Sequence, residues 1–203
     1  MIFQSLYSNQ FKSIAKNPTN TRSSKIILPT HQVIANIVKS NTTYNVISLP
    51  DKEYNFTSDL GNKKVDIAIV DDDNQLRGAI MFKAIRREYN KNSNNYYENM
   101  KGESSLFLDN NIPVYQIICI PTLIQTGIKN GKITYEVPTK ESYSRYCNFI
   151  ANHMPYWDKL KLGVYYFDIN YDDNFATTYS SKIVSGVEPT ITEGIINFTK
   201  EIN

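Results

Sequence analysis

The chain has 203 residues, of which 41% are apolar, and its formal net charge is +2. This length and apolar content suffice for one hydrophobic core, so we expect a single domain over residues 1–203. The small net charge excludes a histone-like polycation, although it leaves room for a local basic face that binds DNA. No apolar run reaches the length of a membrane span, and we expect a cytoplasmic protein with no membrane partner.

Two amphipathic helices are predicted near the start of the chain. Apolar side chains recur at helical spacing in residues 2–14, and they lie on one face of residues 29–40. The polar segment between them, residues 17–25, indicates a loop. A short strand is then predicted over residues 46–49.

A β-hairpin is the clearest local prediction, and it forms a core motif at about residues 63–86. Apolar residues alternate along residues 63–70 and fill residues 76–85, as expected of two strands. The acidic and amide-rich segment over residues 71–75 is typical of the turn that joins them.

The rest of the chain alternates between helices and strands. Residues 112–120 (IPVYQIICI) form a continuous apolar run that is typical of a strand buried on both faces. The other predicted elements are, in order, a helix over 90–108, a strand over 133–137, a helix over 139–153, a strand over 162–170, an irregular polar segment over 174–186 and a helix over 190–202 capped by Thr190 or Thr192. This order predicts an α/β fold with a central mixed β-sheet flanked by helices.

Cysteine and histidine give no sign of a metal or redox centre. Cys119 and Cys147 show neither disulfide nor metal-binding spacing, which fits a reducing compartment. His31 and His153 stand in no metal-binding or nuclease motif, and we expect both to be ordinary polar residues.

Two charged residues interrupt the apolar strands of the hairpin. Asp66 stands alone among apolar neighbours in the first strand, as Lys83 does in the second. Side chains alternate along a strand, so Met81 and Lys83 share a face, and an in-register hairpin brings Asp66 beside them. One interpretation is a structural ion pair, since a buried charge needs a partner. The other is a nuclease site, in which a carboxylate holds Mg²⁺ and a lysine orients the attacking water.

On the residues KVDIAIV around Asp66 and IMFKAI around Lys83, the sequence resembles the PD-(D/E)xK nuclease superfamily, the fold of most type II restriction endonucleases. The resemblance covers roughly residues 60 to 121 and continues through the helix and the buried strand that follow the hairpin. It implies a restriction-endonuclease-like core and Mg²⁺-dependent, sequence-specific cleavage of double-stranded DNA to 5′-phosphate ends, with Mn²⁺ as a possible substitute. Cleavage of a symmetric site further implies a homodimer.

The second acid of the family motif is missing. Met81 stands where an aspartate or glutamate normally binds the metal, and a thioether is a poor ligand for a hard cation. The resemblance implies that a glutamate from the following helix supplies this ligand, and Glu98 is preferred to Glu103 on its spacing from Lys83. The alternatives are a catalytically inactive or regulatory DNA-binding relative, an inactivated variant, a repair or junction-resolving nuclease, and an unrelated α/β domain.

A group of polar residues directly follows the lysine strand, and we expect it to contact DNA at the mouth of the site. Guanidinium forks suit phosphates and guanine edges, whereas side-chain amides suit adenine or phosphate. The alternatives without a DNA-binding role are a solvated basic edge and a cluster of capping or turn residues. The candidates are Arg86, Arg87, Lys91, Asn94 and Asn95.

Overall fold

A computed structural model describes residues 2–16, 24–129, 132–138, 145, 148–149, 152–153, 158–171, 177–180 and 190–203. Its elements in chain order are α1 (Ile2–Lys16), the short helix η2 (Ser24–Ile26), α2 (Leu28–Lys39), β1 (Asn45–Ser48), β2 (Tyr54–Ser58), β3 (Gly61–Val65), β4 (Ile67–Val70), β5 (Leu76–Ala84), α3 (Tyr89–Leu108), β6 (Val114–Pro121), β7 (Ile124–Lys129), β8 (Lys132–Glu136), β9 (Leu160–Ile169), β10 (Thr177–Ser180) and α5 (Ile191–Ile202). Within these residues, no helix is both long and apolar enough to cross a bilayer.

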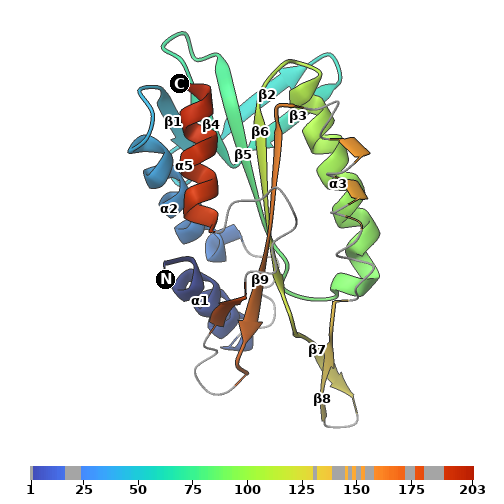
Figure 1. Cartoon of the computed structure of the whole chain (residues 1–203). Coiled ribbons are helices and arrows are strands. Elements are labelled where there is room, and N and C mark those ends of the chain that lie inside the picture. The colour runs from blue at the N-terminus through green and yellow to red at the C-terminus, as the bar shows by residue number, and fades with distance from the viewer. Residues whose placement is uncertain are drawn as a thin grey trace.

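The main sheet of the described residues has six strands in the order β1-β4-β5-β6-β9-β10. β5, β6 and β9 are parallel to one another, and the other neighbouring pairs are antiparallel. Figure 1 shows α1, α2 and α5 on one face of this sheet and α3 on the other. The predicted α/β fold with a mixed sheet flanked by helices is therefore confirmed.

Alternation along β5 distributes its side chains between two cores. Ile80 and Phe82 pack with the side chains of α1, α2 and α5, whereas Ala79 and Met81 pack with Met100 and Phe107 of α3. Every residue of β6 is buried, which agrees with the apolar run predicted to form a central strand. Met81 and Lys83 thus share the α3 side of the sheet, as the strand period predicts.

Local hydrogen bonds explain where two of the helices begin. Thr190 is the N-cap of α5, and its side chain accepts a hydrogen bond from the Glu193 N–H, as predicted. At the start of α3, Glu88 is in the left-handed region with φ 47°, and the Tyr89 N–H donates to a carboxylate oxygen of Glu136 in β8. The hairpin formed by β7 and β8 therefore meets the end of α3 that follows β5.

The structure corrects the first strand of the predicted hairpin. The segment over 63–70 divides at Asp66 into β3, which pairs with β2, and β4, which pairs with β1 and β5. The chain passes from one sheet to another at this point, so Asp66 lies in a break between strands. The predicted turn is confirmed, because the Asp71 side chain accepts a hydrogen bond from the Gln75 N–H.

Other differences concern short or peripheral elements. β2 and β7 were not predicted, and β10 forms a strand inside a segment predicted to be irregular. Most of the helix predicted over 139–153 lies outside the described residues, as does Cys147. Cys119 is a buried free thiol, as expected.

Candidate active site

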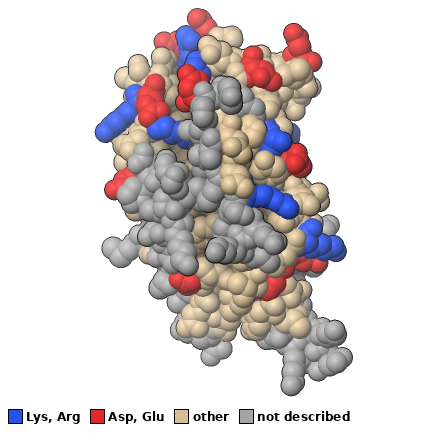
Figure 2. All heavy atoms as spheres, turned by 45° about the vertical axis from the view of Figure 1, so that its right-hand side comes forward, with Lys and Arg blue, Asp and Glu red and all other residues tan. Residues whose placement is uncertain are grey.

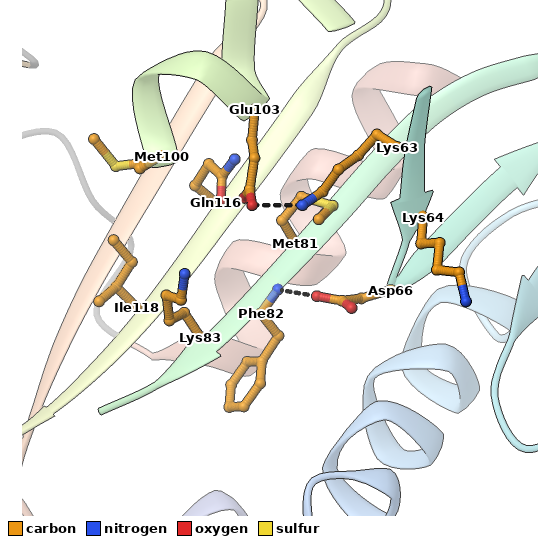
Figure 3. Close-up of a pocket in the computed structure, with 10 residues that line it drawn as sticks. All are labelled: Lys63, Lys64, Asp66, Met81, Phe82, Lys83, Met100, Glu103, Gln116 and Ile118. Carbon is orange, nitrogen blue, oxygen red and sulfur yellow. Dashed lines mark hydrogen bonds and ion pairs between the residues drawn. The ribbon is translucent and has the colours of Figure 1, made fainter. Parts of the chain in front are cut away.

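A cavity of about 280 Å³ lies on the α3 side of the sheet, next to the break between β3 and β4. Figure 3 shows polar side chains from β3, β5, α3 and β6 around Met81 and Ile118, while the Lys64 side chain points away from them. The lining residues are Lys63, Lys64, Asp66, Met81, Phe82, Lys83, Met100, Glu103, Gln116 and Ile118. Asp66 and Lys83, which the sequence singled out, therefore line one cavity.

Asp66 is held against β5 by a backbone hydrogen bond. Its Oδ2 accepts from the Phe82 N–H at 2.8 Å (Figure 3). Burial raises the pKa of Asp66, and the charge of Glu103 acts in the same direction. His31, the Phe82 hydrogen bond and Lys63 oppose this rise, but the net pKa stays above its ordinary value. The two carboxyl groups line the same cavity.

Glu103 enters the cavity from α3, while Glu98 does not. The Glu103 carboxylate forms an ion pair of 2.5 Å with Lys63, and both side chains are mostly buried. The Glu98 side chain is 66% exposed, and its nearest cation is Lys101 at 3.9 Å. Five residues along a helix amount to a rotation of about 140°, so the two glutamates project in different directions. The preference for Glu98 drawn from spacing is thus reversed by the helix face.

Lys83 lines the cavity without pairing with Asp66. No ion pair joins these two residues, so the structural pair considered from the sequence is not formed here. Instead, the Lys83 Nζ lies 5.3 Å from the centroid of the Tyr96 ring, in a cation–π contact. The ammonium group is consequently free of carboxylate partners among the described residues.

Several lining residues were missed by the sequence analysis. Gln116 of β6 lies opposite Met81 in the parallel register, and its Nε2 donates to the Ser104 Oγ at 3.3 Å. A glutamine inside an otherwise apolar central strand is a signal that was available in the sequence. Lys63 and Lys64 come from β3, and their proximity to the site follows from the break at Asp66.

His31 lies behind Asp66, on the α2 side of the sheet. Its ring is 5% exposed and makes an edge contact with the Phe82 ring, with 6.1 Å between the centroids. Burial lowers the pKa of His31, and the nearby Asp66 partly offsets this effect. His31 is therefore a buried neighbour of the site, and the expectation of an ordinary polar residue missed this placement.

The residues predicted to contact DNA lie near the cavity but do not line it. Arg86 and Arg87 are half-buried just beyond the end of β5, whereas the other three are exposed on the first turns of α3: Lys91, Asn94 and Asn95. Figure 2, which brings the α3 side of Figure 1 forward, shows Lys and Arg interspersed with Asp and Glu. This face therefore carries local rather than continuous positive charge.

The cavity is lined by two carboxylates, a number that can suffice for a magnesium ion. In the described part of the chain, no three His, Cys, Asp or Glu residues gather into a metal-binding group. A magnesium site needs fewer protein ligands than three, because the ion is commonly held by one or two carboxylates, with water and substrate phosphates completing the octahedron. Asp66 and Glu103 supply two such carboxylates, and the Lys63 ammonium neutralises Glu103 in their vicinity.

Comparison with protein-family models, with curated proteins and with solved structures finds no match for this chain. Its function must therefore be inferred from the chemistry of the cavity.

Proposed function

We propose that this protein is a divalent-metal-dependent endonuclease of the PD-(D/E)xK type that hydrolyses phosphodiester bonds in double-stranded DNA. One observation carries the proposal: a single cavity collects Asp66, Glu103 and Lys83 from the hairpin and the helix that follows it. Phosphodiester hydrolysis needs carboxylates to hold a divalent cation and a further group to place the attacking water. The cavity contains side chains suited to both tasks.

Each of these side chains has a distinct role in the proposal. Asp66 and Glu103 would hold Mg²⁺ or Mn²⁺, and the Phe82 N–H keeps the Asp66 carboxylate in position. A bound cation supplies charge neutralisation at the phosphate and a water of lowered pKa. Lys83 would orient the attacking water and balance negative charge on the phosphate, because no carboxylate of the described residues competes for its ammonium group.

A narrower form of the proposal is a type II restriction endonuclease that cuts a specific site and leaves 5′-phosphate ends. It is supported by the resemblance at Asp66 and Lys83 and by the order hairpin, helix and buried strand. Because a symmetric DNA site matches a two-fold symmetric protein, this form also predicts a homodimer.

Two features favour a second candidate, a DNA-binding protein that does not cleave. Met81 replaces the usual acid, and Lys63 already neutralises Glu103. Of the three lysines that line the cavity, Lys63 pairs with Glu103 and Lys64 pairs with Glu53, so Lys83 is the one without a carboxylate partner among the described residues. A lysine with no carboxylate partner suits a phosphate even without a metal, and it predicts salt-sensitive binding that chelators leave unchanged.

The deciding experiment is cleavage of plasmid and phage DNA in Mg²⁺ or Mn²⁺ by the full chain. We expect discrete fragments from the wild type, a loss of at least about 100-fold in Asp66→Asn and Lys83→Met, and no loss in Asp73→Asn. Asp73 is the matched control because it is an exposed carboxylate in the hairpin turn, outside the cavity.

Two further outcomes distinguish the candidates. Cleavage by Met81→Glu alone would show an intact scaffold with an inactive site, in favour of the second candidate. The nuclease proposal would be overturned if neither protein cuts and calorimetric titration with Mn²⁺ detects no binding.

A further inference from the structure

Beyond the cavity, Arg86 is a cation without a carboxylate partner in the described part of the chain. Its Nη1 is enclosed by protein and has no hydrogen-bond partner among the described residues. Arg87 lies 4.0 Å from Glu88, and Arg77 pairs with Asp71 at 2.9 Å, but no described carboxylate pairs with Arg86. Enclosing Nη1 without a hydrogen-bond partner costs free energy, while the Arg86 side chain as a whole is only half-buried. The arrangement fits an anion supplied from outside.

The position of Arg86 links it to the cavity through Tyr96. Arg86 follows β5 two residues after its end, where the chain turns towards α3. The charge of Arg86 acts on Tyr7 and on Tyr96. The Tyr96 ring is also affected by the charge of Arg87, stacks on Tyr89 at 6.1 Å between centroids, and carries the Lys83 Nζ at 5.3 Å from its centroid. Three cations therefore border one ring, and Lys83 among them lines the cavity with Asp66.

We propose that Arg86 forms a phosphate subsite for the nucleic-acid backbone, next to the phosphate that Lys83 contacts. The guanidinium fork can bind two oxygens of one phosphodiester, and Tyr96 spaces it from Lys83. This proposal rests on the proposed function for one point, namely that the anion at Lys83 is a DNA phosphate. The presence of an anion at Arg86 does not depend on that function. It assigns positioning of the strand, rather than base recognition, to Arg86.

The test measures binding of a fluorescent DNA duplex by the full chain in EDTA, where no cleavage can occur, over a series of salt concentrations. Loss of one phosphate contact lowers the slope of log K against log salt by about 1. We expect Arg86→Gln to show this change and about tenfold weaker binding, equally for unrelated duplex sequences. Arg86→Lys should keep the slope but bind more weakly, because it retains the charge and loses the fork.

Arg77→Gln is the matched control, since Arg77 lies on β5, the strand that precedes Arg86, but pairs with Asp71 and is 55% exposed. Its salt slope should equal that of the wild type. Thermal unfolding separates binding from structure: Arg86→Gln should have an unchanged or higher Tm, because it removes an unpaired charge. A lower Tm together with an unchanged salt slope would overturn the proposal in favour of a structural arginine.

Free phosphate distinguishes a backbone subsite from a site for a small anion. Inorganic phosphate should compete with the duplex only weakly. Tight, Arg86-dependent binding of inorganic phosphate with no effect of Arg86→Gln on the duplex would refute the backbone assignment. Failure of the nuclease proposal would look different: the wild type would not cut DNA in Mg²⁺, yet duplex binding in EDTA would still depend on Arg86.

Discussion

At the scale of single residues, the environment of Asp66 is the most consequential feature of the site. The carboxyl group is partly buried, lies within the influence of the Glu103 charge, and accepts one hydrogen bond, from the Phe82 N–H, among the described residues. These conditions favour its protonated form until a cation is bound. A raised pKa in a cavity that other charged groups line is typical of a functional site.

A pH dependence follows from the raised pKa of Asp66. Because a metal binds only the deprotonated form, Mn²⁺ affinity should fall as the pH drops through this raised pKa, above the range in which an ordinary aspartate titrates.

In EDTA, a raised folded-state pKa means that the contribution of Asp66 to stability is full at low pH and is lost as pH rises through that value. Asp66→Asn should therefore have a higher Tm than the wild type near neutral pH.

Calorimetric titration with Mn²⁺ and thermal unfolding, both repeated over a series of pH values, measure these two effects. The Tm advantage of Asp66→Asn should shrink towards acidic pH, where the wild-type carboxyl group is protonated. An Asn variant that is no more stable than the wild type at any pH would contradict the inferred burial of an ionised Asp66.

At the scale of elements, the orientation of α3 on the sheet places Glu103, and not Glu98, in the lining of the cavity. Its buried residues Met100, Ser104 and Phe107 mark the face that meets the sheet, and Glu103 lies beside this face. Glu98 projects into solvent. The helix is largely polar, so its inward face is set by a few contacts rather than by a continuous apolar stripe.

Exchange of each glutamate for glutamine tests this placement. Glu103→Gln removes a carboxylate from the cavity, so we expect Mn²⁺ affinity and Mg²⁺-dependent cleavage to fall by at least about tenfold. Glu98→Gln removes an exposed charge outside the cavity and should leave both unchanged. Calorimetry and plasmid cleavage provide the measurements, and a larger loss in Glu98→Gln than in Glu103→Gln would show that the helix binds metal with its other face.

At the scale of the whole molecule, the site is built on the most protected part of the sheet. β5 and β6 are central, parallel to each other and covered by helices on both faces. β2 and β3 form a separate two-stranded sheet in which two of the ten residues, Phe56 and Val65, are buried. Lys83 and Gln116 thus stand on rigid strands, while Asp66 lies where the exposed sheet joins the protected one.

Native-state hydrogen exchange should reveal this difference. Amides of β6 should exchange only through global unfolding, whereas amides of β2 and β3 should exchange at least about tenfold faster through local opening. Addition of Mn²⁺ should slow exchange near Asp66 if the cation binds there. Equal protection of β3 and β6 in the metal-free protein would contradict this view of the fold.

Local patterns in the sequence determined much of the architecture and part of the site. The apolar run of β6 and the capped periodicity of α5 depend on neighbouring residues alone, and both elements form as predicted. The same holds for Met81 and Lys83, because the two-residue period of a strand places them on one face. The isolated charges of Asp66 and Lys83 therefore identified two cavity residues before their surroundings were known.

Only the tertiary structure decided how those residues are partnered. Spacing along the chain favoured Glu98, but the packing of α3 on the sheet brings Glu103 to the cavity. Lys63 reaches the cavity because β3 belongs to a separate sheet and ends next to Asp66. The Lys83 ammonium group contacts the Tyr96 ring rather than Asp66. These contacts join separate elements, and their relative rotation depends on how whole faces pack, which no local pattern in the chain specifies.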